Sequence, residues 1–304
     1  MAEFDVLGLG AVAVDDLIFV DEYPDPDSKV RVCEALREGG GLCGTALVAA
    51  ARLGARCAYL GVLGEDELSH FTREQLENEG IDCSKVLYAE EARPHHSTII
   101  IDRARDTRTI FSDERGTREV PGTHISIELV GRARVLFVDH TTPIAGHRAA
   151  RIARELGIAV VADIERTSPA IEDLLPLVDH LLIGLKLGRE LTGESAPAEI
   201  VRLLSRNRDV AIVTDGERGC WACCGQEAHQ VLWTPAFEVD VVDTTGCGDV
   251  FHGAYAACLA RNEPLPSRLQ TASACAALKA RQPGGRRGIP DRATIESFLH
   301  SRLS

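Results

Sequence analysis

Val239-Asp-Val-Val-Asp-Thr-Thr-Gly-Cys-Gly-Asp-Val-Phe-His-Gly-Ala-Tyr-Ala-Ala-Cys258 is the stretch around which the rest of the chain is organised. A β-branched apolar run, two glycines and a small-residue segment predict a strand, a tight turn and a closely packed helix. The N–H groups of Gly246, Cys247 and Gly248 are expected to converge on an anion, because the first N–H groups of a helix have no partner within it. Asp249 follows. It is expected either to cap the helix or to accept a proton from a hydroxyl that attacks a phosphoryl group.

The composition limits the kind of partner that the chain can attract. Its 304 residues include 33 Lys and Arg against 46 Asp and Glu, a formal charge of −13, which argues against binding nucleic acid or an anionic membrane. No apolar run approaches the roughly 20 residues of a membrane span, and the first residues lack the basic start of a signal peptide. The ten cysteines, several of them in apolar runs, are expected to be buried small hydrophobes. We therefore expect a cytoplasmic protein.

Alternating strand and helix patterns predict an α/β fold, with a mostly parallel central sheet and helices on both faces. The predicted buried strands lie at residues 4–10, 57–64, 134–139, 158–163, 181–184 and 209–214. Insertions at about 15–38 and 93–113 alternate polar and apolar residues instead, and they predict a small β-sheet lid that includes a strand at Lys29–Leu36. With no internal repeat, residues 1–304 are expected to form a single domain.

A second glycine-rich segment, Gly39–Gly54, also leads into a helix. Its glycines allow a backbone to approach a ligand closely. Asp15 and Asp16 lie in an otherwise apolar segment, and one of them is expected to point inward.

Two strand-end carboxylates and one glycine turn are further candidates. Asp139 and Asp163 end apolar strands, where open parallel sheets place their ligands, although such an aspartate can equally cap the next helix. Capping is favoured for Asp139, and both roles stay open for Asp163. Thr214, Gly216 and Gly219 either line a nucleotide or simply form a hairpin-type turn.

At this point the chain resembles the ribokinase-like, or PfkB-type, carbohydrate kinases. Asp243-Thr-Thr-Gly-Cys-Gly-Asp249 is similar to the Asp-Thr-x-Gly-Ala-Gly-Asp signature of that family. The segments Gly39–Gly54, Val213–Gly219 and 283–290 occur in the order that the family uses. The resemblance covers essentially the whole chain and implies a ribokinase-like fold, with Asp249 as the catalytic base beside an anion hole at Gly246, Cys247 and Gly248.

The same resemblance implies contacts on both sides of that centre. It implies ATP and Mg²⁺ as cofactors, with K⁺ as a candidate monovalent cation. The residues that it assigns to the sugar are Asp15, Gly40, Gly41 and Gly44. Thr214, Gly216 and Gly219 would face ATP, while Asp243 and the Thr245 carbonyl look like part of a monovalent-cation site.

Three positions depart from the family pattern. Gly44 stands where many members carry a sugar-binding asparagine. Gly184-Leu-Lys-Leu187 stands where a magnesium-associated Asn-x-x-Glu motif is expected, so Asp163 or water would hold the metal. The runs at 239–254 and 277–291 look most like the sulfofructose kinase branch, but Asp139-His-Thr-Thr142 lacks the arginine that this branch uses for its sulfonate.

The leading hypothesis is therefore an ATP-dependent sugar kinase that acts on a primary hydroxyl of a ketose or a related sugar or sugar acid. A nucleoside kinase is an alternative, although only 5% of the residues are aromatic, which leaves few rings to stack on a base. A non-catalytic sugar-sensing protein on the same scaffold is another. An apolar face on the lid would also support a homodimer.

Overall fold

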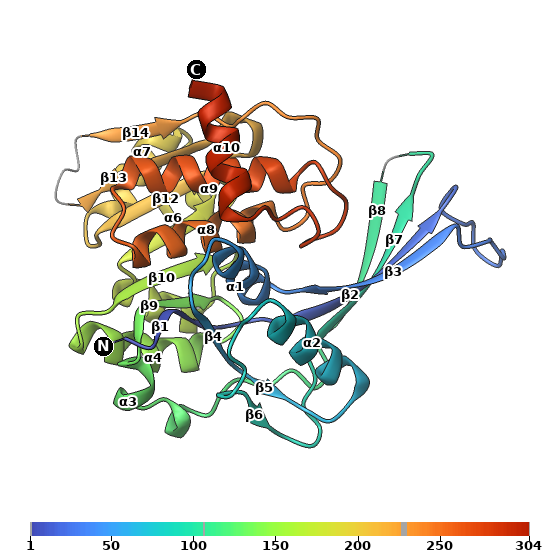
Figure 1. The fold of residues 1–304 in the computed structure, drawn as a ribbon, viewed down its shortest axis with the longest axis horizontal. Helices are drawn as coiled ribbons and strands as arrows, with labels where there is room; N and C mark the ends of the chain where they lie inside the picture. Colours follow the sequence, from blue (N-terminus) through green and yellow to red (C-terminus); the bar gives the residue numbers. More distant parts are fainter. Residues whose placement is uncertain (1, 106, 226–229, 304) are drawn as a thin grey trace.

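Eight strands form the central sheet of the computed structural model, which describes residues 2–105, 107–225 and 230–303 (Figure 1). From edge to edge their order is β14-β13-β12-β11-β10-β9-β1-β4. The six strands from β12 to β4 are parallel, and β13 and β14 run antiparallel to their neighbours. Their bounds are β1 Phe4–Leu9, β4 Cys57–Leu60, β9 Ala133–Asp139, β10 Ala159–Ile164, β11 His180–Gly184, β12 Val210–Thr214, β13 Cys220–Cys224 and β14 Val231–Thr234. The predicted mixed α/β class is confirmed.

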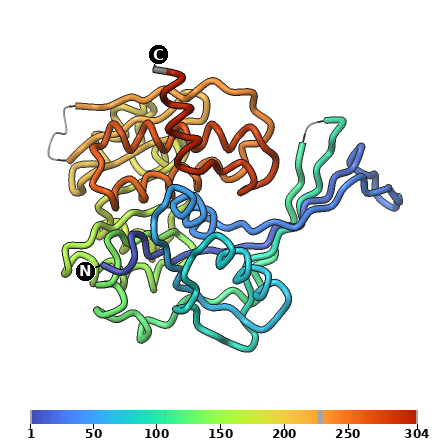
Figure 2. The backbone as a smooth tube through the Cα atoms, in the orientation of Figure 1, coloured from blue at the N-terminus to red at the C-terminus, as the bar shows by residue number. Residues whose placement is uncertain are grey.

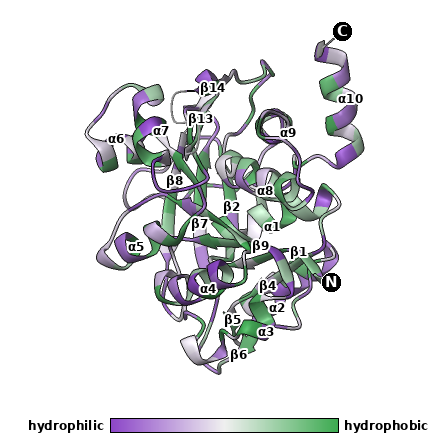
Figure 3. Cartoon of the chain, turned by 90° about the vertical axis from the view of Figure 1, so that its left-hand side faces the viewer, coloured by the Kyte–Doolittle hydropathy of each residue, from purple (hydrophilic) through white to green (hydrophobic). Residues whose placement is uncertain are grey.

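Helices cover both faces of this sheet because successive strand residues point to opposite sides. Val135 and Phe137 of β9 pack in one hydrophobic cluster, and Leu136 and Val138 pack in the other. The first cluster involves α1 Leu42–Arg52, α2 Glu67–Asn78, α8 Cys247–Ala260, α9 Leu265–Lys279 and α10 Arg292–Leu303. The second involves α3 Ile127–Val130, α4 Pro143–Glu155, α5 Pro169–Leu174, α6 Leu185–Thr192 and α7 Pro197–Ser205. Figure 3 shows hydrophobic colour on α1, α8 and nearby strands, and hydrophilic colour on the surface helix α5.

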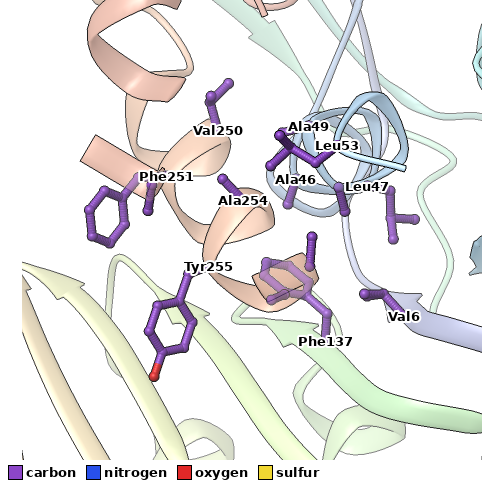
Figure 4. Packing of buried hydrophobic residues seen from close by; sticks show 14 of the residues in the cluster. Val6, Ala46, Leu47, Ala49, Leu53, Phe137, Val250, Phe251, Ala254 and Tyr255 are labelled. Atoms are coloured by element: carbon purple, nitrogen blue, oxygen red, sulfur yellow. The ribbon is translucent and has the colours of Figure 1, made fainter. Parts of the chain in front are cut away.

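Helices α1 and α8 lie in contact over the sheet (Figure 4). A Cβ atom on Gly253 would lie only 1.9 Å from the carbonyl oxygen of Ala46, so a larger residue would force the two helices apart. Ala254 and Val250 of α8 are fully buried beside them. This close packing holds the N-termini of two glycine-led helices on the same side of the sheet.

A second, four-stranded sheet projects from the body of the molecule (Figures 1 and 2). It has the order β3-β2-β7-β8 and is called the lid sheet below. Its strands are β2 Ala13–Val20, β3 Glu34–Gly40, β7 His95–Asp102 and β8 Thr107–Asp113. A two-stranded ribbon of β5 Val62–Leu63 and β6 Leu87–Tyr88 lies apart from it.

Two strand predictions were wrong. The strand expected at Lys29–Leu36 begins only at Glu34 and continues through Gly39 and Gly40. The reason is its pairing with β2, which runs from Glu34 opposite Phe19 to Gly40 opposite Ala13. Its last two residues are therefore the glycines that were assigned to a helix start.

The strand expected at Val239–Val242 is not formed in the described part of the chain. The N–H of Val242 donates to the carbonyl of Ala280, at 2.8 Å, so this segment is tied to the end of α9 instead of to a sheet edge. Val241 and Val242 are consequently about 60% exposed, although they are β-branched and apolar.

None of the helices in the described ranges combines the length and apolar character that a membrane span needs.

Candidate active site

The turn before α8 presents main-chain N–H groups at the edge of the sheet. Gly246 adopts a φ of 73°, a left-handed conformation that favours glycine, and α8 starts at the next residue. The N–H of Cys247 donates to the Thr244 carbonyl at 3.2 Å, and helical bonding begins with Val250 N–H to Gly246 O at 2.9 Å. Of the three N–H groups predicted to face an anion, that of Cys247 is therefore engaged, which corrects the prediction, while those of Gly246 and Gly248 have no main-chain acceptor in the described part of the chain. The N–H of Asp249 in the first turn is likewise available.

Asp249 is half-buried in that first turn. The surrounding protein raises the pKa of its carboxyl group well above the usual value, and the charges of Asp163, Glu165 and Asp139 raise it further. The Arg286 guanidinium acts in the opposite direction. A base whose pKa is raised toward the working pH is better matched to accepting a proton from an alcohol.

Asp163 and His252 form a buried pair behind Asp249. Oδ2 of Asp163, at the end of β10, lies 2.7 Å from Nδ1 of His252, and both side chains are almost fully buried. His252 is three residues after Asp249 on α8, so the two side chains share a face of the helix. Glu165, two residues beyond Asp163, is exposed to solvent as a residue, but surrounding protein partly desolvates its carboxyl group, and this and the Asp163 charge raise its pKa.

Asp139 has a different role from the helix cap that was favoured for it. Its Oδ2 accepts hydrogen bonds from the Ala11 N–H at 2.7 Å and the Cys43 N–H at 3.3 Å, and its Oδ1 accepts from the Thr141 N–H at 2.8 Å. Thr142, which precedes α4, makes no side-chain cap. Asp139 therefore stabilises the start of α1 and the end of β1 across the sheet, and the prediction that it caps its own following helix was wrong.

Asp15 of β2 and the glycines before α1 form a second cluster. A Cβ on Gly40 would lie 2.2 Å from Asp15 Oδ2, so the carboxylate lies directly against the Gly40 backbone. Burial raises the pKa of Asp15, partly offset by a hydrogen bond with Ser97 and by the charge of Arg286. Gly41 has a φ of 85° and lies against the Ala11 carbonyl. The structure thus brings together the residues that were predicted to meet a sugar.

Arg286 occupies the space that two of these glycines leave open. A Cβ on Gly44 would lie 2.4 Å from Nη2, and one on Gly39 would lie 2.3 Å from Nη1. Nη2 donates to the Gly40 carbonyl at 2.5 Å and Nε donates to Thr45 Oγ1 at 3.3 Å. The residue is only 8% exposed, and burial lowers the pKa of its guanidinium to about 10. Among the described residues no carboxylate oxygen lies within 4.0 Å of that guanidinium.

A cavity of about 1220 Å³ opens on the other side of the anion turn. Thr214, Gly216 and Gly219, which were predicted to face a nucleotide, all line it together with Cys247 and Gly248. Further lining comes from apolar side chains such as Val239, Val241, Phe251 and Ala277. The size suits a nucleotide, and the apolar lining suits a planar base.

The residues of the predicted monovalent-cation site are held by protein groups. The Asp243 carboxylate accepts hydrogen bonds from the Thr245 N–H at 2.8 Å and the Gly284 N–H at 2.9 Å. The Asp243 carbonyl accepts one from Nζ of Lys279 at 2.9 Å. Burial acts to raise the pKa of the Asp243 carboxyl group, but its hydrogen bonds lower it on balance.

The lid sheet is connected to this turn at two points. Arg108 of β8 donates to Thr245 Oγ1 at 2.5 Å. Glu38 of β3 lies 2.8 Å from Arg287, and a Cβ on Gly284 would lie 2.0 Å from its carboxylate. Burial raises the pKa of Glu38. Any movement of the lid sheet therefore acts on the loops at 243–245 and 284–287.

Sequence reasoning missed four of these groups: Glu165, His252, Lys279 and Arg286. For two of them the sequence contained a usable indication, because Lys279 follows an apolar, alanine-rich run from Ala274 to Leu278 and Arg286 belongs to the basic cluster at 286–287. Glu165 and His252 have no such indication. The relation of His252 to Asp163, and that of Glu165 to Asp249, arises only when β10 packs against α8.

Comparisons with known proteins agree with this geometry. The family described as pfkB family carbohydrate kinase matches residues 5–292. An ATP-dependent ribose-1-phosphate kinase of Halopiger xanaduensis is 26% identical over 319 residues, covering 98% of this chain and 99% of the relative. Fructokinase-1 of Oryza sativa is 28% identical over 289 residues, covering 86% and 88%. A crystal structure from Agrobacterium tumefaciens, of a protein described as a ribokinase, has 28% identity and a TM-score of 0.89, with 99% of each chain covered.

The raised pKa of Asp249 predicts a specific pH dependence. Because a base must be ionised to accept a proton, kcat/KM is expected to fall as the pH drops through the raised pKa, above the value near 4 of an ordinary carboxyl group. Glu165→Gln removes one of the charges that raise this pKa, so the acidic limb should move to lower pH. The matched control is Glu172→Gln, on exposed α5. An unchanged limb in Glu165→Gln, measured over pH 4–9, would contradict the electrostatic coupling.

Proposed function

Because this chain belongs to the pfkB family of carbohydrate kinases, we propose that it transfers the γ-phosphoryl group of ATP to a primary hydroxyl of a ketose or a related sugar or sugar acid. The observation that carries the proposal is the position of Asp249. It lies in the first turn of α8 beside the free N–H groups, with the nucleotide-sized cavity reaching Gly248 on one side. On the other side, Arg286 is near both Asp15 and Asp249, whose negative charges act to raise the pKa of its guanidinium.

In the proposed reaction Asp249 accepts the proton of the acceptor hydroxyl as its oxygen attacks the γ-phosphorus. The N–H groups of Gly248 and Asp249 stabilise the equatorial oxygens of the phosphoryl group, whose transition state is largely dissociative. Positioning and neutralisation of charge therefore supply most of the acceleration. The lid sheet would exclude water that could otherwise take the place of the acceptor.

Magnesium would enter with the nucleotide. No group of three or more potential metal ligands gathers in the described ranges of the chain, so the protein offers no complete cage. Mg²⁺ commonly uses one or two carboxylates plus phosphates and water, and the strand-end pair Asp163 and Glu165 fits that pattern. Asp163 is already engaged by His252, whereas Glu165 is exposed, so Glu165 is the better placed of the two. The metal would neutralise charge on the phosphates of ATP.

The acceptor pocket favours a substrate that carries negative charge. Gly44 lacks the amide that many family members offer to a sugar hydroxyl, and the Arg286 guanidinium lies there instead. Two of its nitrogens are bonded to Gly40 and Thr45, while Nη1 lies over Gly39. Burying a guanidinium without a carboxylate partner costs free energy, and a bound anion that accepts its hydrogen bonds would offset that cost. We therefore place sugar acids and other anionic sugars ahead of neutral ketoses.

Asp249→Asn tests the base. It should lower kcat at least about a hundredfold, the low end of general-base effects, while ATP affinity stays nearly unchanged because the turn is preserved. The measurement is ATP consumption over a panel of ketoses, aldoses, sugar acids, sulfosugars and nucleosides. Unchanged turnover in this variant would remove Asp249 from the mechanism.

Tight sugar binding by the wild-type protein without turnover of any panel member would favour a sugar-sensing role.

Arg286→Met tests the acceptor class. On anionic acceptors it should lower kcat/KM at least about tenfold more than on neutral ones, because a charge-assisted hydrogen bond is lost only with the former. Arg287→Met is a neighbouring control, since that side chain is half-exposed and pairs with Glu38. Equal losses on both classes of acceptor would assign Arg286 to packing alone.

The lid sheet also supports a homodimer. Its edge strand β8 exposes Ile110 and Phe111 by about half, and Val30 and Val32 are similarly exposed in the connection between β2 and β3. Apolar side chains on an edge strand invite pairing with a second copy. Sedimentation at micromolar concentration should give a dimer that Phe111→Asp dissociates and Ile144→Asp, on exposed α4, does not. A wild-type monomer under these conditions would overturn the proposal.

We further propose a cytoplasmic location without nucleic-acid or membrane partners. The supporting observations are the formal charge of −13 and the burial of thiols such as Cys43, Cys57 and Cys275 as small hydrophobic groups in the core.

A further inference from the structure

Lys279 is the last residue of α9, and its side chain is completely buried. Its neighbours in sequence are apolar, from Ala274 to Leu278 and at Ala280. Lysine is almost never fully buried without a partner, because removing an ammonium group from water costs several kcal/mol. The partner therefore indicates what this lysine does.

That partner is a main-chain carbonyl. Nζ donates to the Asp243 carbonyl oxygen at 2.9 Å, and no carboxylate oxygen in the described ranges lies within 4.0 Å of it. The Asp243 carboxylate is occupied elsewhere, by the N–H groups of Thr245 and Gly284. Carbonyl oxygens are the usual protein ligands of monovalent cations such as K⁺. An ammonium group is a compact point charge, so it suits the same ligand.

A free cation does not fit the predicted site as it is built here. Such a site was assigned to Asp243 and the Thr245 carbonyl, and the Asp243 carbonyl already accepts a hydrogen bond from the Lys279 ammonium group. The Arg108 guanidinium of the lid sheet brings a second positive charge there through its bond to the Thr245 hydroxyl. Both cationic groups come from the protein. A K⁺ ion at the Asp243 carbonyl would have to displace a buried ammonium group.

We propose that the Lys279 ammonium group is a built-in replacement for the monovalent cation, holding the loop at 243–245 in place so that the anion turn keeps its shape. This inference rests on the proposed kinase function and makes Lys279 a positioning residue. The loop leads directly into Gly246, and the Ala280 carbonyl also accepts the N–H of Asp243 at 3.0 Å. Burial raises the pKa of the Cys247 thiol, and the Lys279 charge acts in the opposite direction, so that charge reaches the anion turn.

The first arm of the test uses the wild-type protein. ATP-dependent turnover and the thermal midpoint are measured in tetramethylammonium chloride, KCl, NaCl and NH₄Cl at constant ionic strength. We expect turnover to agree within about twofold in all four salts, and no K⁺-specific rise in the midpoint. Activation of the wild type by K⁺ of about tenfold or more, or a K⁺-specific rise in its midpoint, would show a free-cation site and overturn the proposal.

The second arm uses Lys279→Met, with Lys85→Met as a control outside this site. In tetramethylammonium chloride the Lys279 variant should lose at least about tenfold in kcat, and K⁺ or NH₄⁺ should restore part of it. K⁺ should also raise its thermal midpoint by about 3 °C or more, a change that is absent from the control. A folded Lys279→Met variant with wild-type kcat, or one that neither cation rescues, would reduce Lys279 to a packing role.

The readouts separate this inference from the proposed function. If no acceptor is turned over, the kinase proposal fails, yet the thermal midpoints still report whether Lys279 occupies a cation site. If Lys279→Met does not fold, Lys279→Gln keeps a polar side chain of nearly the same reach without the charge. The wild-type arm can overturn the proposal in either case, because it needs no variant.

Discussion

The close approach of α1 and α8 is the constraint on which the site depends. Gly253 allows α8 to lie against the Ala46 carbonyl of α1, and a single added methyl group would not fit. Each helix is preceded by a glycine with positive φ, Gly41 and Gly246, and each presents its N-terminus at the carboxyl edge of the sheet. One helix start carries the cluster of Asp15 and its glycines, to which we assign the acceptor, and the other carries the anion turn. In the proposed reaction the distance between acceptor and phosphoryl donor is thus set by packing in the core, away from the reacting groups.

Four carboxylates gather near these helix starts: Asp139, Asp163, Glu165 and Asp249. Such a cluster is destabilising unless its charges have partners or solvent, and three of the four carboxylates meet that need in different ways. Asp139 accepts main-chain hydrogen bonds, Asp163 pairs with His252, and Glu165 stays exposed to solvent. Asp249 alone gains no strong partner. Its raised pKa is the consequence of that arrangement, and a general base can use it.

The sequence predicted what depends on local pattern and failed where distant segments meet. The turn at Gly246–Gly248 and the parallel strands could be predicted, because glycine spacing and apolar periodicity are local properties. The grouping of Asp15 with its glycines came from the resemblance to the family. The sequence wrongly predicted a strand at Val239–Val242. Its β-branched apolar residues are typical of a buried strand, but Val239 and Val241 line a cavity instead, and the local pattern does not distinguish the two. Arg286 lies 242 positions after Gly44 in the chain, so the sequence shows a missing asparagine but not the guanidinium that fills its place.

The segment from Lys279 to Arg287 joins all of these parts. Lys279 and Gly284 bond to Asp243, and Gly285 lies against Gly246. Arg286 bonds to Gly40 and Thr45, and Arg287 pairs with Glu38 of the lid sheet. The lid sheet and Arg286 are therefore connected to the anion turn through fewer than ten residues of chain. With the acceptor at Arg286, as we propose, its binding would be coupled to assembly of the phosphoryl site.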